Sequence, residues 1–405
     1  MEHIYRRLAP SEEIFVASEH YFAMTLLVRG PLRIEALDAA VTAMCAAAPM
    51  LAARIADVTD GYAYAAGGQR QQLFVTDGDP DAPLNAAELA RHDLLFGVFV
   101  VRAGDRAAVS MQFHHSLADG PRGLSLLAQL WSLYGDATAG RALIPAPQPF
   151  PEPVETLLAE RGVVKFGEPD PEPRETIRLD VDPEAKFVAP HLASAALTVA
   201  ETDALLALAA RQEVTLNGLV SAALLLAETE LGGIPLHELL YVFMVDLRAR
   251  LNPPLAPMDG SNIMGFAAYM PAADVAAELV PLARAVNEHL RVSLEYGVVQ
   301  QTPLHSSNMP DSSALEMPNL VMCTNLGRIP DLTGTETLDV EDFVLLGSLS
   351  ARGRRPTYQV RTFAGRLSVD WPHYDDTPEA AQHRVDTVIG TLRAAVESAP
   401  MSVGQ

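Results

Sequence analysis

Two adjacent histidines, His114 and His115, are followed after three residues by Asp119 and Gly120. The residues just before this motif alternate like a β-strand, and those after Gly120 have the apolar spacing of an amphipathic helix. Histidine has an ordinary pKa near neutrality, so it can take a proton from a hydroxyl or amine nucleophile and later return it. The motif therefore predicts His115 as a general base, with its ring facing a cavity at the strand end.

The other residues of the motif are predicted to support this base. Asp119 is too close in sequence to serve freely as a second base, so we expect it to hold the turn, through an arginine elsewhere. Gly120 is expected to allow a backbone angle that a Cβ would resist. Successive strand residues point to opposite faces, so His114 and His115 are not expected to bind one metal ion, and we predict no metal site. The alternative is a structural or surface histidine pair.

The composition fits a globular enzyme rather than a nucleic-acid or membrane protein. The chain has 405 residues, 49% of them apolar, and a net charge of −22. That length suits two domains, and the negative charge argues against nucleic acid and against anionic membranes. No apolar run is long enough for a transmembrane segment, and the N-terminus lacks a signal-peptide core. Two cysteines are too few for a disulfide framework, so we expect a cytoplasmic protein.

The chain is predicted to have two halves. Residues 1–150 form the first and carry the motif, residues 151–175 form a proline-rich linker, and residues 176–405 form the second. The linker is predicted from prolines that alternate with acidic residues. Predicted strands and helices follow one another in a loosely similar order in both halves.

The stretch 114–120 resembles the signature of the HxxxDG acyltransferase superfamily. This group includes chloramphenicol acetyltransferase, the condensation domains of peptide synthetases, the plant BAHD enzymes and the polyketide-associated acyltransferases. The resemblance is closest to the last group, whose V-D-L-R sequence matches residues 245–248. Shorter matches lie at 49–54, 260–267 and 319–328. The D-F-G-W-G sequence of the plant branch is missing near the C-terminus, so that branch is set aside.

The resemblance implies an α/β (α+β) fold of two chloramphenicol-acetyltransferase-like domains, with mixed sheets, flanking helices and an active-site tunnel at the domain interface. It also implies that Arg248 pairs with Asp119, whereas the residues alone leave a local pair with Asp246 open. Asn325 either helps a developing oxyanion or stabilises a turn. Three further residues are expected to contact substrate: Ser116, Asn262 and Gly327.

The function implied by the resemblance is O-acyl transfer without a bound cofactor. The co-substrate would be acetyl-CoA, another acyl-CoA or a phosphopantetheinyl acyl carrier, and the acceptor a polyketide-derived or lipidic alcohol. Acetyl transfer from acetyl-CoA is the leading expectation, and long-chain transfer from a polyketide synthase onto a diol is the second. Two alternatives are an amide-forming condensation enzyme, which would use the same His115, and a catalytically silent module that binds a carrier protein.

The densest group of basic residues lies between 352 and 366 in the second half. Such a group either docks an anionic donor or forms a solvated strand edge. Its members are Arg352, Arg354, Arg355, Arg361 and Arg366.

Overall fold

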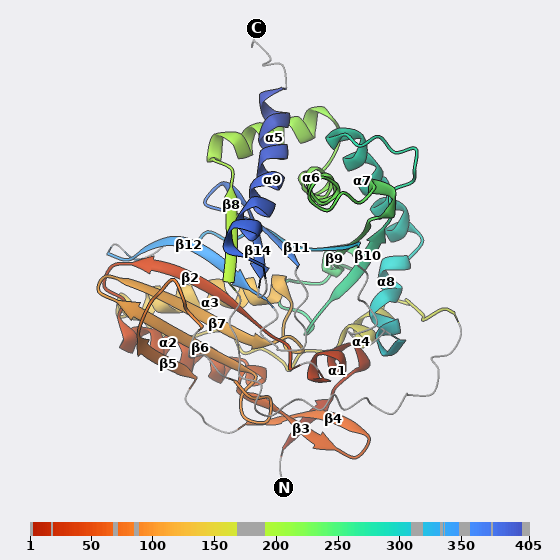
Figure 1. The fold of residues 1–405 in the computed structure, drawn as a ribbon. Coiled ribbons are helices and arrows are strands. Elements are labelled where there is room, and N and C mark those ends of the chain that lie inside the picture. Colours follow the sequence, from red (N-terminus) through yellow and green to blue (C-terminus); the bar gives the residue numbers. More distant parts are fainter. Residues whose placement is uncertain are drawn as a thin grey trace.

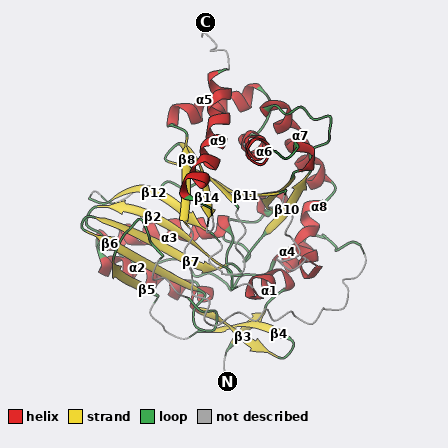
Figure 2. Cartoon of the chain, viewed as in Figure 1, coloured by secondary structure: helices red, strands yellow, loops and turns green. Residues whose placement is uncertain are grey.

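The computed structural model describes residues 3–17, 19–67, 72–84, 89–167, 191–308, 319–332, 335, 337–347, 357–373 and 376–398. This part of the chain contains sheets of three, five and six strands, which are flanked by helices (Figures 1 and 2). The five- and six-stranded sheets both combine parallel and antiparallel pairs. The fold is therefore of the mixed α/β class that the sequence predicted.

The five-stranded sheet presents the histidine motif. Its strands, in spatial order, are β12 (Asp339–Leu346), β2 (Tyr21–Arg29), β7 (Arg106–His114), β6 (Phe96–Ala103) and β5 (Leu73–Asp77). β7 lies in the middle and pairs antiparallel with both neighbours, with Tyr21 opposite His114. Helices α2 (Ile34–Ala47) and α3 (Gly120–Thr138) share an apolar core with one face of this sheet. A central strand with two hydrogen-bonded neighbours is a rigid support for the residues at its end.

Two smaller groups of elements lie beside this sheet. The three-stranded sheet has the order β1 (Ile4–Arg7), β4 (Gly61–Ala66) and β3 (Ala53–Val58). The short helices are α1 (Pro10–Ala17) and α4 (Val154–Ala159). They contact each other through Glu155 of α4, whose carboxylate accepts hydrogen bonds from the backbone N–H and the hydroxyl of Ser11, both at 2.9 Å.

The six-stranded sheet supports the second half of the molecule. Its order is β10 (Met264–Tyr269), β9 (Leu240–Asp246), β11 (Leu320–Arg328), β13 (Tyr358–Phe363), β14 (Arg366–His373) and β8 (His191–Ala196). The helices of this half are α5 (Val199–Arg211), α6 (Leu216–Gly232), α7 (Leu279–Glu295), α8 (Val298–Gln301) and α9 (Pro378–Glu397). Figure 1 shows α5, α6, α7 and α9 together in its upper part, and they share a second apolar core with this sheet.

Local sequence accounts for these helices. Thr215 caps the start of α6, because its side chain accepts a hydrogen bond from the Gly218 N–H at 2.9 Å, and Gly233 caps the end with a positive φ of 62°. Its middle is apolar on every side and buried. Among the described helices, none alone is long and apolar enough to cross a membrane; α5 and α6 reach the required length and composition only as a pair bent by 104°.

One late strand crosses back to the first half. Although β12 follows β11 in the chain, it pairs antiparallel with β2 at the edge of the five-stranded sheet (Figure 1). β12 begins at Asp339, where its pairing with β2 reaches Arg29. The division of the chain at 150 and 176 stays a prediction. The described part of the linker contacts both halves: the Pro151 carbonyl accepts from Arg6 Nε at 3.0 Å, whereas Val154, Leu157 and Leu158 belong to the apolar core of the second half.

Candidate active site

His115 is the accessible side chain of an otherwise buried stretch. Every residue from Met111 to Asp119 is buried except His115, which is half-buried. The strand β7 ends at His114, and the backbone N–H of His115 donates to the carbonyl of His20 at 2.7 Å. The motif therefore presents one imidazole at the end of a central strand, as a general base requires.

Aromatic rings surround this imidazole. Phe15 of α1 stacks on it at 4.6 Å between ring centroids, His20 meets it edge-on at 5.0 Å, and Phe22 is tilted against it at 4.8 Å. Burial lowers the pKa of His115, and this outweighs the ring's hydrogen bonds to backbone carbonyls and the nearby charge of Asp119. The ring is thus neutral at pH 7 and able to accept a proton.

Asp119 joins the two halves beside His115. Its Oδ2 lies 2.7 Å from Nη1 of Arg248 and also accepts a hydrogen bond from the Ile263 N–H at 2.7 Å. Its Oδ1 accepts a hydrogen bond from the Arg122 N–H at 3.0 Å and so caps the start of α3. The predicted contact with Arg248 is therefore present. The local alternative is present as well, because Nη1 of Arg248 also lies 3.1 Å from Oδ1 of Asp246. Asp119 faces away from solvent and holds the turn.

Gly120 was predicted to adopt a backbone angle that a Cβ would resist, and this prediction is wrong. Gly120 is not among the described glycines with a positive φ, so it adopts an angle that other residues tolerate. A Cβ at this position would instead lie 2.7 Å from Cδ2 of Leu326 on β11. Glycine fits here because the end of β11 approaches the start of α3 closely.

A loop of the second half, residues 258–263, is fastened to the motif. Arg122 of α3 donates to the backbone carbonyls of Met258 and Gly260, the latter at 2.8 Å. The hydroxyl of Ser261 donates to Glu12 at 2.6 Å. Asn262, which was predicted to contact substrate, lies beside His115: its Nδ2 is 3.1 Å from Nδ1 of His115 and donates to the His115 carbonyl oxygen at 3.2 Å.

His114 and Ser116 form a buried pair behind His115. The Ser116 hydroxyl lies 2.7 Å from Nδ1 of His114, and both side chains are fully buried. Burial is the main cause that lowers the pKa of His114 to about 3, so this ring stays neutral. The two histidines occupy different surroundings, as predicted for successive strand residues. Ser116 is engaged inside the protein, which does not fit the predicted contact with substrate.

Asn325 and Gly327 form a turn at the end of β11. Oδ1 of Asn325 accepts from the Gly327 N–H at 2.8 Å, and its Nδ2 donates to Asn217 of α6 at 2.9 Å. Gly327 is exposed and has a positive φ of 67°. This geometry matches the turn-stabilising alternative for Asn325, and its amide is already satisfied on both sides.

Of the basic group in the second half, one described arginine is buried in ion pairs and another is exposed to solvent. Arg361 is buried and pairs with Asp370 and, at 3.3 Å, with Asp342 of β12, so it helps to join the two halves. Arg366 is exposed. Arg352, Arg354 and Arg355 lie outside the described residues.

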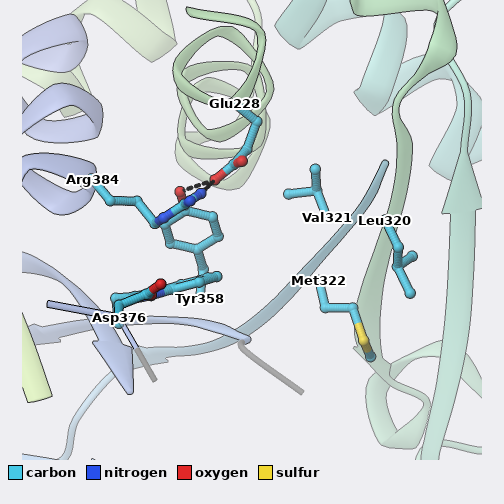
Figure 3. Close-up of a pocket in the computed structure, with 8 residues that line it drawn as sticks. Glu228, Leu320, Val321, Met322, Tyr358, Asp376 and Arg384 are labelled. Carbon is cyan, nitrogen blue, oxygen red and sulfur yellow. Dashed lines mark hydrogen bonds and ion pairs between the residues drawn. The ribbon is translucent and has the colours of Figure 1, made fainter. Parts of the chain in front are cut away.

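A cavity of about 240 Å³ lies between α6, α9 and the sheet of the second half (Figure 3). One wall is polar, where Glu228 accepts hydrogen bonds from Tyr358 and Arg384, and the opposite wall carries Leu320 and Met322. It lies at the start of β11, whereas Asn325 and the contact with Gly120 lie at the other end of that strand. The cavity is therefore separate from the His115 site.

Sequence reasoning missed two charged residues of the site, Arg122 and Glu12. Both are buried, and burial is the main cause that lowers the pKa of Arg122 to about 10. Glu12 pairs with Arg6 at 2.6 Å and accepts from Ser261. Nothing in the local sequence marks them, because Glu12 stands between Ser11 and Glu13, and Arg122 between Pro121 and Gly123. In the described residues, no group of histidine, cysteine and carboxylate side chains is placed to hold a metal ion.

Known proteins share this fold and are similar in sequence. Residues 187–372 match the family model described as phthiocerol/phthiodiolone dimycocerosyl transferase C-terminus, and residues 38–223 match the wax ester synthase/diacylglycerol acyltransferase catalytic domain. The structure of polyketide synthase associated protein 5 from Mycobacterium tuberculosis is similar, with a TM-score of 0.79, 26% identity and 99% coverage of both chains. The epimerization domain of tyrocidine synthetase B, at 14% identity and a TM-score of 0.67, shares the fold. Together these define an acyltransferase of the HxxxDG superfamily.

The sequence relatives narrow this class. A phthiocerol/phthiodiolone dimycocerosyl transferase of Mycobacterium tuberculosis is 30% identical over 409 residues, which cover 96% of this chain and 97% of the relative. The Mycobacterium leprae protein of the same name is 29% identical with the same coverage. The chain belongs to the family of phthiocerol/phthiodiolone dimycocerosyl transferases.

Proposed function

We propose that the protein transfers an acyl group from a thioester to a hydroxyl of a polyketide-derived or lipidic alcohol, with His115 as the general base. The observation that carries this proposal is the half-buried imidazole at the end of β7, in a motif whose other side chains are buried; burial lowers the pKa of this ring. The names of the relatives, which describe acyl transfer to phthiocerol or phthiodiolone, support this class of acceptor.

The proposed reaction is a direct transfer. His115 removes the hydroxyl proton as the oxygen attacks the thioester carbonyl, and the tetrahedral intermediate then expels the thiolate. The proton held by the ring returns to the leaving sulfur. The two substrates would approach the ring through a tunnel between the halves.

The cysteines support direct attack rather than an acyl-enzyme. Burial raises the pKa of both Cys45 and Cys323 to about 12, so neither is a thiolate at neutral pH. Cys45 lies within α2, and Cys323 lies on β11. A thiol nucleophile would need the opposite surroundings, with a base or a positive charge beside it.

The test is a panel of acyl-CoA donors, from acetyl to palmitoyl, with a long-chain diol as acceptor. Thiol release and mass spectrometry of the products are measured for the wild type and for His115→Ala. We expect ester with a preferred chain length, and a loss of about 10²- to 10⁴-fold in His115→Ala, the usual contribution of a general base. A His115→Ala protein with full transfer activity would refute the mechanism.

A second arm of the test supplies the same acyl groups on a phosphopantetheinyl carrier protein. Ester formed only in this arm would assign the donor to a carrier rather than to coenzyme A. Offering a long-chain amine in place of the diol tests the amide-forming alternative, because product mass distinguishes ester from amide. If neither ester nor amide forms in any arm, while the carrier binds, the silent carrier-binding module is the better description.

A further inference from the structure

Asn262 contacts the proposed base from the other half of the molecule. It lies 147 residues after His115 in the chain and is buried, with 7% of its surface exposed. Its Nδ2 lies 3.1 Å from Nδ1 and 3.2 Å from the backbone carbonyl oxygen of the same histidine. One amide nitrogen therefore meets both the ring and the backbone of His115.

The orientation of this amide follows from its neighbours. If the amide oxygen stood in place of Nδ2, two oxygens would face each other at 3.2 Å without a proton between them. The nitrogen is thus the favourable atom at this point, and it donates to the His115 carbonyl. The positive end of the amide dipole then lies beside the imidazole.

The loop that carries Asn262 is fixed on both sides. Before it, the Ser261 N–H donates to the Glu152 carbonyl at 3.1 Å and the Ser261 hydroxyl to Glu12 at 2.6 Å. After it, the Ile263 N–H donates to Asp119 at 2.7 Å. A side chain between two such anchors is preorganised, so its contact with the ring does not depend on a mobile loop.

We propose that Asn262 is a positioning residue for the general base: its amide holds the imidazole of His115 in one orientation and in the neutral form. General-base action at Nε2 needs the proton on Nδ1 and a free lone pair on Nε2. The carbonyls of His115 and Ala118 accept hydrogen bonds from the ring, and Asn262 fixes the first of these carbonyls. With the proton on Nδ1, Asn262 makes no hydrogen bond to that atom: the Nδ1–H and the Asn262 amide both donate to the His115 carbonyl oxygen, and the positive end of the amide dipole disfavours the imidazolium. This inference rests on the proposed role of His115.

The other groups around the ring do not replace Asn262. His20 lies edge-on to it, and burial lowers the pKa of His20 well below the ordinary value, so that ring is neutral. The neutral His114 lies behind it, and Phe15 and Phe22 carry no charge. Asp119 favours the imidazolium, but its charge is paired with Arg248. Of the neighbours described here, Asn262 is the one whose polar side-chain atom contacts both the ring and the carbonyl of His115.

The experiment measures the titration of the His115 ring directly. The full chain is prepared with ¹³C- and ¹⁵N-labelled histidine, the His115 signals are assigned by their loss in His115→Ala, and their pH titration is followed by NMR. A carboxylate within about 4–6 Å of a histidine favours the charged form and shifts its titration by about 1–3 pH units. We therefore expect Asn262→Asp to move the His115 midpoint upward by that amount. Asn262→Ala should move it upward by less.

The matched control is Asn217→Asp in α6. Asn217 is half-buried, and like Asn262 it is bonded through its amide, but to Asn325 rather than to His115. The Asn217→Asp variant should leave the midpoint of the His115 titration unchanged. Unchanged midpoints in both Asn262→Asp and Asn262→Ala, in proteins whose circular dichroism matches the wild type, would overturn the inference.

The same variants separate this inference from the proposed function. If His115 is the base, the acid limb of the pH profile of kcat/KM should move upward together with the NMR midpoint in Asn262→Asp. If the midpoint moves and the acid limb does not, Asn262 positions the ring as inferred, but the ring is not the base.

Discussion

Near the site, loss of the ion pair between Asp119 and Arg248 should destabilise the fold more than any other single change of charge. The Asp119 side chain is fully buried, and Arg248 is 2% exposed. Removing one partner of a buried pair leaves the other charge without compensation, which costs about 3–5 kcal/mol. Against a total free energy of unfolding of about 5–15 kcal/mol, this is a large fraction. We expect Arg248→Met, which keeps the volume but not the charge, to show that loss.

Urea unfolding measures the effect, and the chain offers a matched control. Arg291 of α7 pairs with Glu288 at 2.7 Å and with Glu295 at 2.6 Å, but all three side chains are exposed. Such surface pairs contribute little to stability, so Arg291→Met should unfold near the wild-type midpoint. Trp131 lies in α3 and Trp371 in β14, so their fluorescence reports on the two halves separately when one is replaced by phenylalanine.

A second substitution tests the stated cause. In the Arg248→Met background, Asp119→Asn removes the uncompensated charge and should restore part of the lost stability. If Arg248→Met unfolds no earlier than Arg291→Met, the ion pair does not stabilise the contact between the halves and the reasoning is wrong.

Three further outcomes are expected. Burial lowers the pKa of His115, so the imidazole stays neutral in mildly acidic solution. The pKa of the acid limb of the kcat/KM profile should therefore lie below the ordinary histidine value of about 6.5. An acid-limb pKa above that value would contradict the buried surroundings of the ring. In urea unfolding, Gly120→Ala should lower stability by about 1 kcal/mol, because the Leu326 methyl must rotate away. Gly135→Ala in the same helix has open space around the added methyl and should raise stability by about 0.5–1 kcal/mol. Replacing both cysteines with alanine should leave ester formation intact, and intact-protein mass spectrometry should find no acyl-cysteine during turnover.

The sequence by itself determined the local frame of the site. The alternation before His114 predicts the strand β7, the spacing after Gly120 predicts α3, and the change between the two patterns places His115 at a strand end. These features depend on residues that are neighbours in the chain, so short-range periodicity and capping are sufficient to predict them. The resemblance to the superfamily added the partner of Asp119, and the structure contains that contact.

Only the tertiary structure decided what surrounds the imidazole. Arg248 reaches Asp119 across 129 residues and Asn262 reaches His115 across 147, and both contacts depend on how the two large sheets approach each other. Gly120 has an ordinary φ, so local sequence could not show that Leu326 of β11 excludes a Cβ there. Such contacts arise when distant segments pack together, and the pattern of apolar residues in each segment shows which face is buried but not which side chain it meets.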